Sequence, residues 1–442
     1  MHPTSLPSGH IDIDAERFLD LMQALKLHVW QMLPLGIPDH TGSPYQSCSA
    51  FACDPGLLPK DLNAAPDPAG LQRFREQEAH WIEDFARFMV LRRHFDGAAW
   101  HAWPAAYRDR NPDALGEFAR QHASAISAEI AQQYALEQRW QSLRAKAADR
   151  GIRLFGDMPI FVALDSADVW ANRDQFLLDD EGKPTLVAGV PPDYFSETGQ
   201  RWGNPHYDWD RMQQDNFSWW HARMRRQLNW FDMVRLDHFR GLEASWMIPA
   251  EAETAIDGYW QKVPGQALLE SLHEEFEDLP IVAEDLGVIT PEVEALRQQF
   301  SLPGMAVLQF SFDHFEDNPH KPKNIGPDRV VYTGTHDNDT TLGWYRSLDE
   351  NMQHHVREVL HGGPAEEVLE KMIASALATQ GALAVLPLQD LLGLGAEARM
   401  NIPGEVGRNW QWRFSWEQVE RASQLLANFS AAVAANERDH AC

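Results

Sequence analysis

FDMVRLDHFRG, residues 231–241, is the stretch that decides the fold. Its apolar residues predict a short buried strand that ends at Asp237, and Arg235 and His238 lie close to this carboxylate in the sequence. An enzyme that attacks through a carboxylate needs an acid that stays ionised among cations. A surface ion pair after an edge strand is the alternative interpretation of the same residues.

Two further apolar runs end in an acid. LPIVAEDLG, residues 279–287, leads into Glu284, and VVYTGTHDNDT, residues 330–340, leads into His336 and Asp337. Solvated loops seldom produce this pattern three times, because their apolar residues do not cluster ahead of the charge. The three stretches together favour a shared acidic site.

Seven apolar runs are predicted strands, and helical patterns separate most of them: HVWQMLPL, IRLFGDM, MVRLDHF, PIVAEDL, MAVLQFSF, VVYTGTH and ALAVLPLQ. With an eighth strand expected near the first helical region, this repetition predicts an α/β fold, a (β/α)8 barrel with inserted, mostly helical subdomains. The carboxyl ends of barrel strands meet at one face, so the three acids should converge there. An open doubly wound sheet is the competing fold, but no Gly-rich phosphate loop follows the first strand.

We expect one catalytic barrel domain over residues 1–442 with two insertions. Helical periodicity predicts a helical subdomain over approximately 65–150. Residues 163–210 lack clear periodicity but interleave aromatic residues with Asp, Asn and Gly, so we expect a long active-site loop there. Within it, residues 187–205 combine turn-forming Gly and Pro with aromatic rings, which predicts a lid that excludes water. Rings that merely pack on the barrel rim are the alternative.

Composition excludes several classes of partner. The chain has 65 acidic against 38 basic residues, a formal net charge of −27 and no Lys/Arg-rich run, so nucleic acid and anionic membranes are poor partners. No apolar run approaches about 20 residues, and the first residues do not resemble a signal peptide. The 3 cysteines can build neither a disulfide framework nor a four-ligand zinc site. We therefore expect a globular cytoplasmic protein without a metal.

Six motifs together resemble one enzyme family. RLDHFRG, AEDLG, THDNDT, SPYQS, PPDYFSETGQRWGNP and RMNIPGEVGRNWQWR are similar to the 4-alpha-glucanotransferases, which are also called amylomaltases or disproportionating enzymes, and the resemblance runs from about Leu33 to Trp412. It implies a barrel of the alpha-amylase type that needs no cofactor. It also implies transfer of alpha-1,4-glucan segments from maltooligosaccharides or from starch- or glycogen-derived glucans to the 4-OH of glucose or maltooligosaccharide acceptors.

The resemblance also implies roles for individual residues. By matching motifs, Asp237 would be the nucleophile, Glu284 the general acid/base and Asp337 the transition-state stabiliser. We expect substrate contacts from Tyr45, Ser47, Asp168, Asp193, Tyr194, Phe195, Trp202, Arg235, His238 and His336. Residues 193–195 match a mobile loop that covers the donor site in the family.

The chain departs from the family pattern at a few positions. Cys53 and Asp54 stand where Gly-Asn is usual, PGE at 403–405 replaces a common PGT, and Arg408 stands where Gly is usual. None of these changes touches the three acids. They bear on acceptor contacts and on the preferred length of the glucan.

The residues themselves support a retaining mechanism, which needs one ionised and one protonated carboxyl group. Arg235 and Asp237 are two residues apart in a strand, so their side chains point to the same face. The apolar residues ahead of Glu284 predict a buried carboxyl group with a raised pKa.

Three other functions use part of the same pattern. A hydrolase on the same barrel would use water as the acceptor. A non-catalytic glucan-binding protein should lack at least one of the three acids, and all three are present. A metal hydrolase could use the adjacent His and Asp pairs, but no HExxH spacing occurs.

Overall fold

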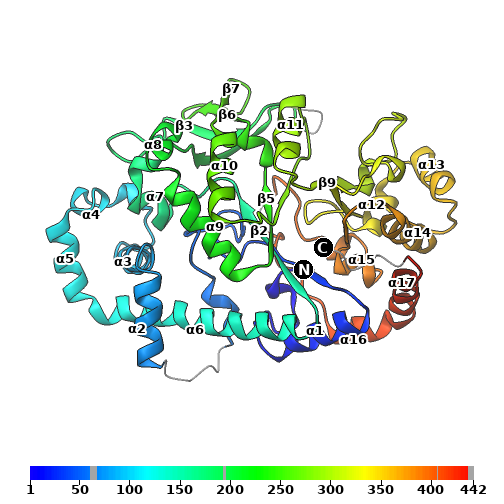
Figure 1. The fold of residues 1–442 in the computed structure, drawn as a ribbon, viewed down its shortest axis with the longest axis horizontal. Coiled ribbons are helices and arrows are strands. Elements are labelled where there is room, and N and C mark those ends of the chain that lie inside the picture. The colour runs from blue at the N-terminus through cyan, green and yellow to red at the C-terminus, as the bar shows by residue number, and fades with distance from the viewer. Residues whose placement is uncertain (60–66, 193–195, 406, 437–442) are drawn as a thin grey trace.

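Parallel strands form a curved wall at the centre of the molecule (Figure 1). The structure, a computed structural model, describes residues 1–59, 67–192, 196–405 and 407–436. The wall contains β1 (Val29–Gln31), β2 (Arg153–Pro159), β5 (Met233–Asp237), β8 (Ile281–Ala283), β9 (Gly304–Val307), β10 (Arg329–Tyr332) and β11 (Leu383–Val385). These strands occupy the seven predicted runs, so the seven strand predictions are confirmed.

The strands pair in two parallel sheets that lie edge to edge. One sheet has the order β1-β2-β5-β8 and the other β9-β10-β11. The Ala283 N–H, at the end of β8, donates to the carbonyl of Pro303, next to β9, at 2.8 Å. This bond continues the wall from one sheet to the next. Strand order therefore follows chain order, as in a (β/α)8 barrel.

The wall has an opening between β1 and β11, which each end a sheet. The eighth strand predicted near the helical region does not occur among the described residues there. Residues 67–150 contain helices and turns, with no strand in this described range: α2 (Pro68–Gln77), α3 (Ile82–His94), α4 (Ala105–Arg108), α5 (Pro112–Gln121) and α6 (Ala123–Ala148). These helices form the lobe on the left of Figure 1.

Polar contacts tie this helical lobe to α9 (Ser218–Trp230). The indole N–H of Trp140 on α6 donates to the carbonyl of Trp230 at 2.9 Å. The buried guanidinium of Arg226 on α9 donates to Glu137 on α6 at 2.9 Å. Because these groups are largely removed from water, they hold the lobe in a defined position against the barrel.

A second, antiparallel sheet, which was not predicted from the sequence, stands beside the barrel. It has the order β4-β3-β6-β7, built from β3 (Leu186–Val190), β4 (Gln200–Pro205), β6 (Ala244–Pro249) and β7 (Tyr259–Lys262). The range 163–210 is therefore not one irregular loop, because it contains β3, β4, α7 (Ala167–Ala171) and α8 (Trp209–Gln214). At Gly189 a Cβ would collide with the carbonyl of Gln200, so the tight β3–β4 pairing requires glycine there.

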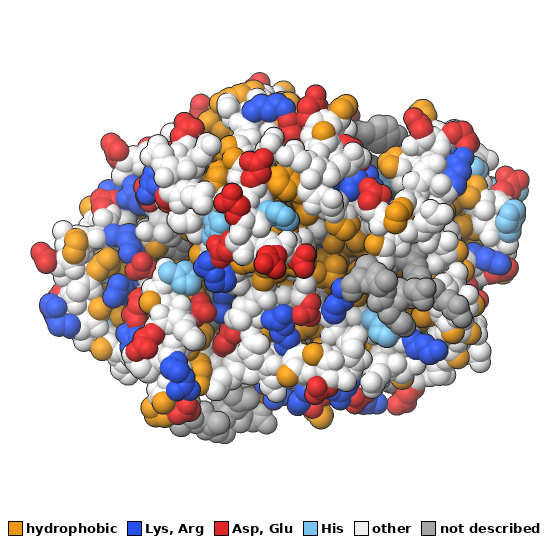
Figure 2. All heavy atoms as spheres, in the orientation of Figure 1, with side chains coloured by type: hydrophobic (Ala, Val, Ile, Leu, Met, Phe, Trp, Pro, Cys, Tyr) orange, Lys and Arg blue, Asp and Glu red, His pale blue; other side chains and the backbone are white. Residues whose placement is uncertain are grey.

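The remaining helices surround the wall: α1 (Ile13–Ala24), α10 (Gly265–Glu275), α11 (Pro291–Gln299), α12 (Thr341–Ser347), α13 (Glu350–Leu360), α14 (Ala365–Ala378), α15 (Leu388–Leu391), α16 (Trp416–Arg421) and α17 (Ser423–Ala435). Acidic and basic side chains are scattered over the face seen in Figure 2. Among the described residues, no helix is both long enough and apolar enough to cross a membrane.

Candidate active site

The predicted nucleophile Asp237 ends β5 and is held by a buried arginine. Arg235 pairs in register with Asp157 on β2, and its Nη1 lies 2.8 Å from both oxygens of that carboxylate. Its Nη2 lies 2.8 Å from Asp237 Oδ1. The side chains of Arg235 and Asp157 are 6% and 1% exposed, whereas that of Asp237 is 28% exposed. Arg235 thus fixes the nucleophile from behind while leaving it accessible.

The charges in this group depend on one another. Burial raises the pKa of Asp157, while the charge of Arg235 opposes this shift. Burial disfavours the charged form of Arg235, but Asp157 and Asp237 outweigh it and hold its pKa well above the usual range. Arg235 is therefore a permanent cation between two carboxylates.

The predicted general acid/base Glu284 follows β8 directly. Its Oε2 accepts from the backbone N–H of His238 at 2.7 Å, and its Oε1 accepts from the N–H of Leu286 at 3.2 Å. Burial raises its pKa to about 7, and the charge of Asp237 adds to the shift, while Arg235 and the His238 N–H oppose it. A carboxyl group with this pKa can give up and regain a proton near neutral pH.

His238 adopts a strained backbone at the centre of the site. Its φ of 54° lies in the left-handed region, which is uncommon for residues other than glycine. Its ring meets that of Trp202 edge-on, with centroids 4.9 Å apart. Burial lowers its pKa to about 4, so the ring is neutral at pH 7. Its Nε2 is buried and has no hydrogen-bond partner among the described residues, so it is available to bond a hydroxyl group.

An aromatic cluster lies between the first and third acids. The Tyr45 hydroxyl donates to Asp157 Oδ2 at 2.7 Å and lies 2.9 Å from His336 Nε2, which can donate to it. The rings of Tyr45 and His336 stack with centroids 5.3 Å apart, and Trp410 lies against both, at 5.8 and 5.9 Å. The cluster links the β2–β5 side of the site to β10.

The predicted third acid, Asp337, lies in the loop after β10 and is the most open of the three. Its side chain is 48% exposed, and Oδ2 lies 3.5 Å from His336 Nε2. Asn401 donates to its Oδ1 at 2.6 Å, and Arg399 donates to its backbone carbonyl at 2.7 Å. The position of Asp337 therefore depends on a segment more than 60 residues further along the chain.

Two of the predicted binding residues support the loop that carries Tyr45. The Ser47 hydroxyl donates to the carbonyl of Ser49 at 2.8 Å. The buried carboxylate of Asp168 accepts from the Ala50 N–H at 2.8 Å, and burial raises its pKa to about 6. These contacts shape the loop, and a direct contact of either residue with substrate stays a prediction.

The structure brings most of the predicted site residues together, namely Asp237, Glu284, Asp337, Arg235, His238, His336, Tyr45 and Trp202. Asp193, Tyr194 and Phe195 lie outside the described residues. Asp157, Asn401 and Trp410 are also part of the site, although they are not among the site residues predicted from the sequence. A signal existed for Asp157, because it also comes near the end of an apolar strand.

Comparisons with known proteins agree on one family. The sequence profile described as 4-alpha-glucanotransferase matches residues 1–65 and 60–418. The chain is 44% identical to the 4-alpha-glucanotransferase of Thermus thermophilus, with 93% of each chain covered. It is 41% identical to the 4-alpha-glucanotransferase of Synechocystis sp., covering 95% of this chain and 94% of that protein.

Solved structures give the same result. Amylomaltase from Streptococcus agalactiae in complex with acarbose superposes with a TM-score of 0.94 at 32% identity, covering 100% of this chain and 99% of the other. Amylomaltase from Corynebacterium glutamicum shares the fold, with a TM-score of 0.78 at 17% identity, covering 98% of this chain and 74% of the other. The chain therefore belongs to the 4-alpha-glucanotransferase family.

Proposed function

We propose that this enzyme transfers alpha-1,4-glucan segments by a retaining double displacement, with Asp237 as nucleophile, Glu284 as acid/base and Asp337 as stabiliser of the transition state. The observation that carries the proposal is the difference between two neighbouring carboxyl groups. Asp237 is bonded to the permanent cation Arg235, and Glu284 has a pKa raised to about 7 by burial. Retaining transfer needs this division between an attacking and a proton-donating group.

In the first step, an Asp237 oxygen attacks C1 of the donor sugar. The bond from C1 to the glycosidic oxygen breaks, and the proton of Glu284 moves to that oxygen, which leaves as the 4-OH of the departing glucan. Asp337 and the neutral His238 ring are suited to hold hydroxyl groups of the sugar while positive charge develops at C1.

In the second step, the acceptor sugar takes the place of the departed glucan. Glu284, now a carboxylate, removes the proton from the acceptor 4-OH, whose oxygen attacks C1 as the bond from C1 to Asp237 breaks. Two inversions at C1 leave the alpha configuration unchanged. Glu284 ends the cycle protonated.

Transfer competes with attack by water, so an acceptor must be held while water is excluded. Support for a cover comes from the β3–β4 hairpin, because Trp202 on β4 packs against His238 next to the nucleophile. We propose that residues 187–205, including Asp193, Tyr194 and Phe195, act as a lid over the bound glucan. We also propose that the helical region over approximately 65–150 and the active-site region over approximately 163–210 are insertions into the barrel domain.

Maltooligosaccharides and glucans derived from starch or glycogen are the proposed substrates. A reducing cytoplasm is the proposed location, supported by the free, buried thiols of Cys48 and Cys53. The departure at Cys53 lies away from the acids, because its backbone N–H pairs with Gln133 on α6 at 3.0 Å.

The experiment that tests the proposal is incubation of the pure protein with maltotriose. Transfer produces glucose together with a ladder of longer maltooligosaccharides, which chromatography resolves. Glucose and maltose alone would instead identify a hydrolase on the same barrel. No turnover of any glucan would contradict both.

A further inference from the structure

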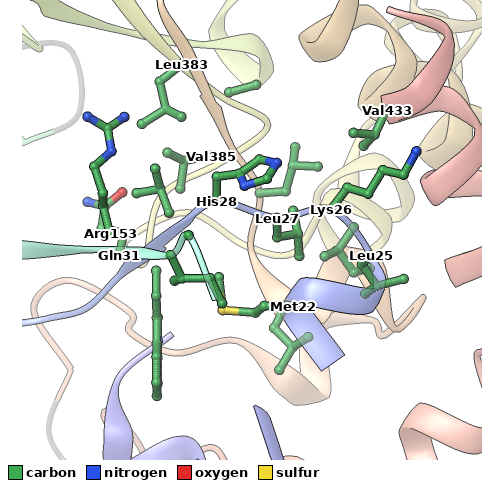
Figure 3. A pocket seen from close by; sticks show the side chains of 18 of the residues that line it. Met22, Leu25, Lys26, Leu27, His28, Gln31, Arg153, Leu383, Val385 and Val433 are labelled. Carbon is green, nitrogen blue, oxygen red and sulfur yellow. The ribbon is translucent and has the colours of Figure 1, made fainter. Parts of the chain in front are cut away.

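The parallel wall is interrupted at two places, which differ in the side chains found there. Between β1 and β11 lies a cavity of about 1090 Å³, lined mainly by apolar side chains such as Leu383 and Val385 (Figure 3). Between β8 and β9 the two sheets meet directly and are joined at Ala283 by a backbone hydrogen bond. We call this second interruption, where residues 281–285 face residues 303–307, the seam.

A carboxylate takes the place of a ladder carbonyl at the seam. In a regular parallel pair, the Met305 N–H on β9 would donate to a backbone carbonyl of β8. It donates instead to Oδ1 of Asp285 at 2.7 Å, and the side chain of Asp285 is only 2% exposed. Because Asp285 follows Glu284 directly, this bond holds the chain at the residue next to the proposed acid/base.

Two arginines hold the same carboxylate. The guanidinium of Arg329, at the start of β10, donates to Oδ2 of Asp285. Arg297 on α11 has its Nε 3.5 Å from that oxygen. The side chains of Arg297 and Arg329 are 1% and 16% exposed. The carboxylate is therefore fixed in one position, because moving it would leave buried charges without partners.

The sequence makes room for this group at Gly304, the first residue of β9. A Cβ there would collide with Arg329 Nη1 and with Oδ2 of Asp285. The φ of Gly304 lies outside the left-handed region, so its backbone conformation does not require glycine. The close approach of the ion pair is what requires glycine at this position.

Glu284 and Asp285 have their partners on different elements. Oε2 of Glu284 accepts from the His238 N–H after β5, and the Glu284 N–H donates to the carbonyl of Leu236 on β5 at 3.1 Å. The carboxylate of Asp285 is bonded to β9, β10 and α11. The chain at the proposed acid/base is thus held by β5 on one side and by the seam on the other.

We propose that Asp285 is a positioning residue for glucan transfer, which fixes the chain at Glu284 and so places the acid/base carboxyl group beside the glycosidic oxygen. The bonds that Asp285 makes across the seam supply the fixed point. Asp285 acts through Glu284, because its own carboxylate is buried among protein groups. This inference rests on the proposed role of Glu284.

Asp285→Asn tests the proposal, because the amide keeps the size of the side chain but cannot neutralise the two arginines. We expect chromatography to show maltotriose turnover lowered about 10–100-fold, because the leaving sugar oxygen needs a well-placed proton donor. Stopped-flow fluoride release from alpha-glucosyl fluoride should fall less than about threefold, since fluoride leaves without protonation. A loss of folded enzyme would lower both rates equally, so equal losses would overturn the proposal.

Asp328→Asn is the matched control for charge. Asp328 pairs with Arg297 at 2.7 Å at the exposed edge of the same network, and its side chain is 53% exposed. This variant should keep both rates within about twofold of the parent. If it showed the same difference between donors as Asp285→Asn, the effect would not come from the seam and the proposal would be wrong.

Gly304→Ala provides a second variant that removes no charge. Its added methyl group pushes against the pair of Asp285 and Arg329, so it should reproduce the selective loss on maltotriose. This variant decides the question if Asp285→Asn does not fold. Equal rates on both donors relative to the parent would count against the positioning role.

A mutant cycle separates the inference from the role of Glu284 itself. In the Glu284→Gln protein, Asp285→Asn should cause no further loss of maltotriose turnover, because the group that it positions is gone. Losses that multiply would overturn the positioning role. If Glu284→Gln alone slowed both donors equally, the proposed acid/base role would fail. If it slowed maltotriose selectively and Asp285→Asn did not, only the inference about Asp285 would fail.

Discussion

The two sides of the candidate active site are held in different ways. Asp237 ends a strand and bonds to Arg235, a side chain only 6% exposed that also bonds to Asp157 on the neighbouring strand. Asp337 follows β10 in a loop, is 48% exposed and depends on Asn401 and Arg399 from a later loop. The proposed nucleophile is thus fixed by a buried charge network, whereas the proposed stabiliser of the transition state is positioned by contacts at the surface.

The largest expected effect is on the strand side. Asp237→Asn removes the attacking oxygen charge and should lower maltotriose turnover by more than about 10⁴-fold. The fold should persist, because Arg235 retains its bonds to Asp157. Circular dichroism and Tm provide the control for folding. Activity within about tenfold of the parent would show that the network does not hold the nucleophile.

The second effect separates proton transfer from attack. Glu284→Gln should slow maltotriose turnover by about 10²–10⁴-fold, because the leaving sugar oxygen needs a proton. An alpha-glucosyl fluoride donor should form the enzyme intermediate almost as fast as in the parent, since fluoride leaves without protonation. A stopped-flow measurement of fluoride release can compare the two donors. Equal losses on both would mean that Glu284 only supports the structure.

The third effect is a pH dependence set by the buried acid. Because the reaction needs Glu284 protonated, activity is present below its pKa and is lost as the pH rises through about 7. Above this value kcat/KM should fall about tenfold per pH unit. The residual activity of Glu284→Gln should not show this fall with rising pH. A fall that persists in the variant would come from the titration of another group.

The smallest effect is expected on the loop side. Asn401→Ala removes the hydrogen bond to Asp337 and should lower kcat by about tenfold, because a stabilising carboxylate is less well oriented. Tm should change little, since Asp337 is half exposed. Asn428→Ala, an exposed change on α17, is the matched control and should have no effect. A large fall in Tm for Asn401→Ala would mean that the contacts around Asp337 support the stability of the fold as the buried network around Asp237 does.

The barrel strands could be predicted because their signal is local. An apolar run such as Ile281–Ala283 becomes a fully buried strand, and the acid that follows it reaches the carboxyl face. The antiparallel sheet lacked this signal. All four residues of β7 are exposed, and β4 contains a glycine and ends in a proline, so neither shows an apolar run.

The partners of individual side chains were harder to predict than the strands. A substrate contact of Asp168 stays a prediction, but no local pattern indicated that its carboxylate accepts from a backbone N–H of a loop more than 100 residues earlier. Asn401 and Trp410 reach the site from a distant segment without any local pattern. Such contacts depend on the tertiary arrangement, which periodicity does not encode.

The dependence of Asp337 on Asn401 has a consequence for the newly made enzyme. A ribosome adds about 5–20 residues per second, so Asp237 and Glu284 leave it several seconds or more before the segment that positions the third acid. A nascent chain that has folded its first strands still lacks the contacts from Arg399, Asn401 and Trp410. The proposed site is therefore complete only after this later segment has been made, and a translation product truncated before Arg399 should lack glucan transfer activity.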